Sequence, residues 1–162
     1  MVTANATLTE SQQARRTRML QATEELALQG GWDGVQMREV NCADTDEYVN
    51  LITISDGQRS IAGTLSGRRA EPRLVAIDGH GLDMPPSAHM VVISNDDRPG
   101  VIGLVGTTMG EHGVNIADMD VGRTPGSGSA VMVLATDVEP PAAAVDKIRQ
   151  APGITSVAVL RG

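Results

Sequence analysis

The sequence predicts an α+β fold, and the main evidence is the order of hydrophobic patterns in residues 89–162. Three observations support the prediction: short β-branched runs, two stretches whose apolar residues recur with helical spacing, and turns rich in glycine or proline between them. Together they give the order β-α-β-β-α-β. That order is typical of the ferredoxin-like arrangement, in which four antiparallel strands carry two helices on one face. A smaller α+β domain is predicted before it.

The first part of the chain is predicted to begin with a polar tail and a helix. The helix covers residues 12–29, where Met19 and Leu26 lie on one side, and Gly30 ends it. Five short strands are predicted after the helix, over 35–40, 48–55, 59–65, 73–77 and 82–84. The predicted segments are a tail and helix start over 1–23, a first domain over 24–84, a linker over 85–88 and a second domain over 89–162.

The second domain is predicted to open with a nearly all-apolar strand over 89–94, followed by a polar loop and a helix. Pro99 fits the first turn of that helix, because its fixed φ suits the position and its missing N–H would have no partner there. The helix is expected to end near Gly113. Its inward-facing stripe is predicted to contain Val101, Ile102, Leu104, Val105, Thr108 and Met109.

The strand predicted after this helix has one irregularity. Val114 and Ile116 share a parity that Met119 and Val121 do not, so a bulge or a late strand start is expected near Ala117. The remaining predicted elements are a strand over 130–136, a helix after Pro140 and Pro141 with Ala144, Val145 and Ile148 facing inward, and a strand over 154–160.

Composition excludes several classes of function. The chain of 162 residues has a net charge of −7 and a pI near 4.8, and its 13 Lys and Arg form no long basic run. Binding to nucleic acid or to an anionic membrane is therefore disfavoured. Cys42 is the single cysteine, so no intrachain disulfide is expected. The N-terminus is polar and no apolar run approaches membrane-spanning length, so the expected location is cytoplasmic.

The polar loop before the first helix of the second domain is the candidate binding site. Backbone N–H groups around Gly100 and Val101 should point at whatever lies over the loop, where the helix dipole favours an anion such as a carboxylate. The side chains of Asn95, Asp97 and Asn115 could hold an ammonium group, and the two groups together make an α-amino acid. An alternative is that Asp97 only complements the helix terminus and the asparagines satisfy turn backbone.

No catalytic or cofactor-binding constellation is evident. The glycines at 100, 103 and 106 do not follow the G-x-G-x-x-G order of a dinucleotide-binding turn. The histidines at 80, 89 and 112 are scattered without the spacing of a metal site, and no serine or cysteine lies in an activating motif. The sequence therefore predicts a protein that is not an enzyme and that uses no metal and no cofactor.

Resemblance to a known family is carried by two runs, NDDRPGVIGLVG and GEHGVNIADMDVGR, which are similar to the signature of the ACT domain, a small ligand-sensing module of amino-acid metabolism. The runs that precede them are YVNLITI, IAGTLSGRR and PRLVAIDGHGLDMPPSAH. They resemble the allosteric substrate-binding domain that comes before the ACT domain in the longer D-3-phosphoglycerate dehydrogenases, the enzymes that open serine biosynthesis. The resemblance covers about residues 24–162.

The resemblance implies a regulatory protein that binds a small amino acid, with L-serine as the first candidate, and that forms a homodimer by edge-to-edge pairing of ACT domains. The effector would contact Asn95, Asp97 and Asn115 and the backbone near Gly100 and Val101. At position 95 the family more often carries His or Tyr. The NAD-binding and catalytic domains of the resembled enzymes lie upstream of the similar region and are not found in this chain.

The first domain is interpreted as a partial allosteric domain, because its expected first strand and helix are not recognisable before residue 24. In the resembled enzymes this domain offers basic residues to a phosphorylated substrate or another anion, and Arg68, Arg69 and Arg73 lie where that could happen. A solvated hairpin end is the simpler alternative. For the whole chain, two other functions stay open: a fragment or separate regulatory subunit that joins a dehydrogenase catalytic chain, and a dimerisation module that binds no ligand.

Overall fold

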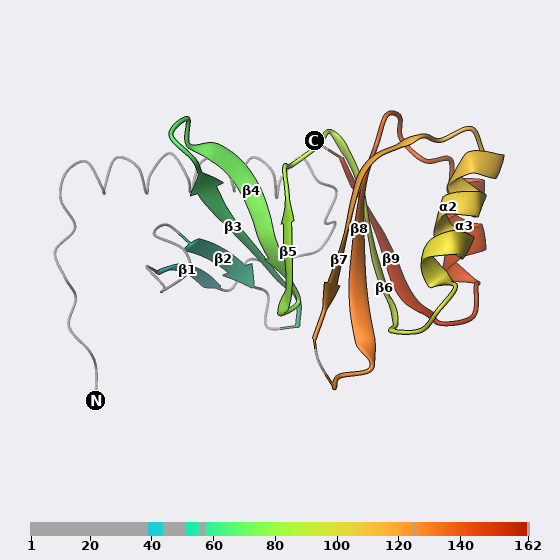
Figure 1. Ribbon diagram of the computed structural model, residues 1–162, viewed down its shortest axis with the longest axis horizontal. Helices are drawn as coiled ribbons and strands as arrows, with labels where there is room; N and C mark the ends of the chain where they lie inside the picture. Colours follow the sequence, from blue (N-terminus) through green and yellow to red (C-terminus); the bar gives the residue numbers. More distant parts are fainter. Residues whose placement is uncertain (1–38, 44–50, 56–57, 125, 162) are drawn as a thin grey trace, which may run out of the picture.

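The computed structural model describes residues 39–43, 51–55, 58–124 and 126–161. The second half of the chain forms a four-stranded antiparallel sheet with two helices on one face (Figure 1). The strands lie in the spatial order β7-β8-β6-β9. In chain order the elements are β6 (His89–Asp96), α2 (Val101–Glu111), β7 (Ile116–Arg123), β8 (Ser129–Thr136), α3 (Ala142–Arg149) and β9 (Ile154–Arg161). The predicted ferredoxin-like βαββαβ fold is confirmed.

The two helices cover one face of this sheet because each presents one apolar stripe. In α3 the three buried side chains are the three that the spacing predicts, Ala144, Val145 and Ile148. In α2 the prediction is wrong at one position, since the side chain of Ile102 is 50% exposed. Pro99 does not lie in the first turn as predicted, because Gly100 is the N-cap and Pro99 comes two positions before the first helical residue, Val101.

The irregularity predicted near Ala117 is confirmed as a bulge. Ile116 pairs with Thr136 of β8, whereas Asp118 pairs with the very next residue of β8, Ala135. Ala117 is therefore an extra residue in β7, and it changes the phase of the strand. As a result Ile116 and Val121 pack into the same helix-side cluster despite their different parity.

The first half of the chain contributes a five-stranded antiparallel sheet in which each strand pairs with the next along the chain. Its strands are β1 (Glu39–Ala43), β2 (Leu51–Ser55), β3 (Ser60–Ser66), β4 (Glu71–Ile77) and β5 (His80–Met84). Strands β4 and β5 each begin two residues before their predicted starts. The predicted helix over 12–29 and the first part of the predicted strand over 35–40 lie outside the described residues.

The two sheets pack face to face, so the described part of the molecule has three layers: five-stranded sheet, four-stranded sheet and helices (Figure 1). One buried cluster joins them. Its members come from β4, β5, β6 and β8, and they are Leu74, Ile77, Leu82, Met84, Met90, Val92, Val131, Val133 and Ala135. The helix-free face of the four-stranded sheet is therefore covered, and the short connection over 85–88 joins two layers that share a core.

The contact between the sheets is closest where β5 lies beside β7. The backbone N–H of Asp83 donates to the Asp120 carboxylate at 2.6 Å. Gly122 lies against the backbone of Gly81, so close that a Cβ on Gly122 would be 2.6 Å from the Gly81 carbonyl oxygen. These contacts fix β7 from the side of the sheet opposite the helices.

Candidate functional site

The loop between β6 and α2 is held by backbone hydrogen bonds from two neighbouring turns. The Asp96 N–H donates to the carbonyl of Gly153 at 2.8 Å, in the turn before β9. The Asp97 N–H donates to the carbonyl of Gly128 at 3.0 Å, in the turn before β8. The two hydrogen bonds fix the loop at both sides within the chain itself.

The Arg98 side chain lies across the neighbouring turn. Its guanidinium group lies directly over Gly153, so that any Cβ at position 153 would collide with it. Gly153 also has a φ of 87°, in the left-handed region that favours glycine. The exposed arginine of the DRPG run thus lies over the turn between α3 and β9.

The amino end of α2 offers unpaired backbone donors to this loop. The first helical hydrogen bond of α2 runs from the Leu104 N–H to the Gly100 carbonyl at 3.0 Å, so the amides of the three residues before Leu104 lie ahead of the ladder. No side chain caps the helix, and its first turn contains no acidic residue. These donors and the helix dipole make a site that favours an anion.

Asn95 places an unpaired acceptor beside the same loop. Its side chain is 5% exposed, and its Nδ2 donates to the carbonyl of Asp96 at 2.7 Å. Its Oδ1 is buried and has no hydrogen-bond partner in the described part of the chain. Asn95 follows Val91 and Ile93 at the alternate spacing of β6, and both pack under the helices, so Asn95 lies on the helix side. A buried acceptor of this kind favours the approach of a donor.

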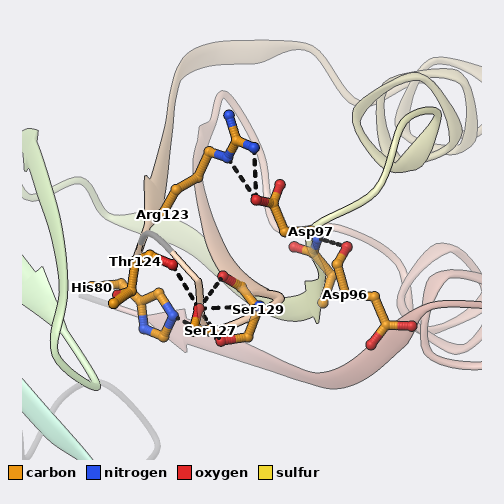
Figure 2. A network of polar contacts seen from close by, with 8 residues as sticks. His80, Asp96, Asp97, Arg123, Thr124, Ser127 and Ser129 are labelled. Carbon is orange, nitrogen blue, oxygen red and sulfur yellow. Dashed lines mark hydrogen bonds and ion pairs between the residues drawn. The ribbon is translucent and has the colours of Figure 1, made fainter.

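Asp97 makes an ion pair that crosses from the loop to the end of β7 (Figure 2). Its Oδ2 accepts a hydrogen bond from Nε of Arg123 at 2.8 Å and lies 2.7 Å from the NH2 nitrogen of Arg123 in the ion pair. The hydrogen bond to Asp97 raises the pKa of the Arg123 guanidinium. Arg123 is a site residue that sequence reasoning missed: it ends the second run of the family signature, but nothing in the spacing shows that it reaches a loop 26 positions earlier.

Asn115 lies apart from Asn95 and Asp97 within one chain. It precedes β7, and its Nδ2 donates to the Asp137 carboxylate at 2.8 Å, beside the end of β8. The loop lies at the opposite end of β7, where Arg123 binds Asp97. Seven residue steps along a strand separate the two ends by about 23 Å. A single chain therefore gathers Asn95, Asp97, Gly100 and Val101, but not Asn115.

The three arginines of the first domain do not form one cluster. Arg68 and Arg69 are exposed in the turn between β3 and β4. Arg73, further along β4, donates from Nε to the Asp83 carboxylate at 2.6 Å and from its NH2 nitrogen to the Asp83 carbonyl at 2.8 Å. The hydrogen bond to Asp83 raises the pKa of Arg73. An anion site here would therefore depend on Arg68 and Arg69, because the Arg73 charge already has a partner.

Within the residues that the structure describes, no group of three or more His, Cys, Asp or Glu side chains is arranged to hold a metal ion. None of the helices that the structure describes has the length and apolar character needed to cross a membrane.

Comparison with known proteins agrees with this geometry. The family model for the ACT domain matches residues 89–153, the part of the chain that carries the loop and both helices. The chain is 35% identical over 131 residues to D-3-phosphoglycerate dehydrogenase of Methanocaldococcus jannaschii, a match that covers 76% of this chain and 25% of that protein. It is 34% identical over 131 residues to D-3-phosphoglycerate dehydrogenase of Bacillus subtilis, a match that covers 78% of this chain and 25% of that protein.

These matches extend well beyond the ACT domain into the five-stranded sheet, since they cover about three quarters of the chain. The chain spans about a quarter of the length of the curated relatives it matches. The chain thus contains an ACT domain at residues 89–153, and about three quarters of the chain is similar in sequence to a quarter of the D-3-phosphoglycerate dehydrogenases.

Proposed function

We propose that the β6–α2 loop binds a small α-amino acid, with L-serine as the first ligand to test, and that this binding is regulatory. The observation that carries the proposal is the buried Asn95 Oδ1 without a partner, beside a helix end that no side chain caps. An amino acid supplies the complement of both features, because its ammonium can donate to Asn95 and Asp97 while its carboxylate accepts from the first amides of α2.

The proposal includes a homodimer in which each site uses residues of both copies. β7 is an edge strand that pairs with β8 alone in the described part of the chain, so its outer backbone groups are open to another strand. If two copies paired antiparallel through β7, the end that carries Asn115 in one copy would lie beside the end that carries Asp97 in the other. This arrangement would complete the predicted set of residues.

The regulated activity is proposed to be that of a phosphoglycerate dehydrogenase, and through it serine biosynthesis. The support is the relatives, which carry that name and match both sheets. Action on a separate catalytic chain and action within a longer polypeptide both agree with a match to about a quarter of those proteins. Copurification of a dehydrogenase activity that responds to L-serine would favour the first arrangement.

Replacement of Asp97 by alanine is expected to abolish L-serine binding. In a thermal-shift assay, L-serine at about 100 times its dissociation constant should stabilise the wild-type chain by about 2.7 kcal/mol and raise its melting temperature by several degrees. The D97A variant should lose that shift, because the ammonium loses its charged acceptor.

The matched control for D97A is D146A, which removes an exposed carboxylate from the ion pair with Arg149 on α3. D146A should keep the full L-serine shift. Absence of a shift with any of the twenty amino acids would contradict the effector proposal and favour a dimerisation module without ligand. 3-Phosphoglycerate and phosphate belong in the same screen, because a shift that requires Arg68 and Arg69 would support the anion site.

A heterodimer of two defective chains is expected to regain one binding site. In the proposed dimer, a D97A chain and an N115A chain combine to give one site with both defects and one site with none. Co-expression with two different tags allows this heterodimer to be isolated, and calorimetry should then find one L-serine per dimer. Each homodimeric variant should bind none. A heterodimer that also binds none would contradict the shared site, with a wild-type dimer carrying both tags as the control.

A further inference from the structure

The ion pair between Asp97 and Arg123 bears on how tightly the loop can hold an amine. Both donors of Arg123 reach the same carboxylate oxygen, Oδ2. The Asp97 side chain is 28% exposed and the Arg123 side chain is 66% exposed, so the guanidinium group forms the outer member of the pair. An ammonium group that approaches Asp97 from solvent therefore meets a carboxylate that already has a cationic partner.

Two physical effects then oppose the ammonium. If it takes Oδ2, it must replace a charge-assisted hydrogen bond and a close ion-pair contact from the guanidinium group. If it takes Oδ1 instead, it comes to rest a few ångströms from another positive charge, and like charges at that separation repel each other even near solvent. Either route lowers the affinity for a ligand that carries an ammonium.

The backbone of β7 keeps Arg123 in this position. The preceding residue, Gly122, lies against Gly81 of β5 on the opposite face of the sheet, with no room for a Cβ. The strand therefore cannot move away from the loop without disturbing the contact between the two sheets. The Arg123 side chain itself is mostly exposed, so it can rotate into solvent while the strand stays in place.

We propose that Arg123 is a built-in competitor of the effector's ammonium at Asp97, and that it thereby sets the affinity and the selectivity of the loop for amines. This inference rests on the proposed amino-acid site. It adds a residue that would weaken binding, whereas every other residue of the site would strengthen it. Arg123 should weaken the binding only of ligands that carry a positive charge.

The test is the binding of L-serine to the full chain carrying Arg123→Gln, measured by calorimetry at low ionic strength. The dissociation constant is expected to fall about two- to fivefold, because one exposed opposing charge has been removed. The gain should shrink as salt is added, since exposed charges are screened. N-acetyl-L-serine, which lacks the ammonium, should bind the wild type and R123Q equally or bind neither.

Arg149→Gln is the matched control, because Arg149 is an exposed arginine in an ion pair with Asp146 on α3. R149Q changes the net charge by the same amount and should leave L-serine binding unchanged. An R123Q variant that binds L-serine as the wild type does, or more weakly, would overturn the inference and leave the amino-acid site standing. Equal tightening in R149Q would also overturn it. If neither the wild type nor R123Q binds L-serine, the proposed function fails and this inference fails with it.

Discussion

Replacement of Met84 by alanine is expected to lower the free energy of unfolding by about 2–5 kcal/mol. The Met84 side chain has 0% exposure and belongs to the cluster that joins the two sheets. Its removal leaves a cavity between layers that are each fixed by their own strand pairing, so the gap cannot easily close. Chemical denaturation followed by circular dichroism measures the change, and the melting temperature should fall by on the order of 10 °C.

Val138→Ala is the control for M84A. Val138 is also apolar, but it is 51% exposed, and its truncation should change the stability by less than about 0.5 kcal/mol. Because the cluster around Met84 is shared, M84A should shift one cooperative transition for both sheets. Two separate transitions, with only one of them moved, would show that the sheets unfold independently and would contradict the shared core.

Gly122→Ala is expected to cost about 1–3 kcal/mol of stability through overpacking. A Cβ at this position would lie 2.6 Å from the Gly81 carbonyl oxygen and 3.0 Å from the Cβ of His80. Neither atom is the end of a flexible side chain, so β5 and β7 would have to move apart. That movement would also strain the hydrogen bond from Asp83 to Asp120. Denaturant titration of the variant measures the loss.

Gly110→Ala provides the opposite expectation from the same chemical change. Gly110 is exposed within α2, and no heavy atom lies within 4 Å of where its Cβ would be. Alanine there should stabilise the chain by up to about 1 kcal/mol, because it favours the helix. If G122A were as stable as G110A, the two strands would have room between them and the close contact would be disproved.

The secondary structure of the second half could be predicted from the sequence because its patterns are local. The β-branched runs and the spacing of Ala144, Val145 and Ile148 each fix one element, and the change of parity near Ala117 revealed the bulge. The packing of the two sheets could not be predicted. The run at 89–94 is apolar on both faces, but that pattern does not identify what covers the second face.

The sequence could predict the site residues that lie on one continuous segment. It could not predict whether a residue on a different strand end lies near them. Asn95, Asp97, Gly100 and Val101 lie on one continuous segment, and the structure gathers them. Whether Asn115 joins them depends on the length and direction of β7, which carry it to the far end of the sheet. The exposure of Ile102 has a similar origin, since the apolar stripe of α2 is narrower than the predicted one and the position of the helix over the sheet decides which residues lie inside.

The bulge in β7 also determines where this chain can change length. Ala117 is the residue without an opposite in β8, so its deletion would join Ile116 to Asp118 in a regular ladder and leave every later residue of the strand on its present face. Deletion of Met119 would instead exchange the faces of the residues that follow it and bring Asp120 to the helix side. Natural variation in length, where it occurs in this strand, should therefore be concentrated at Ala117.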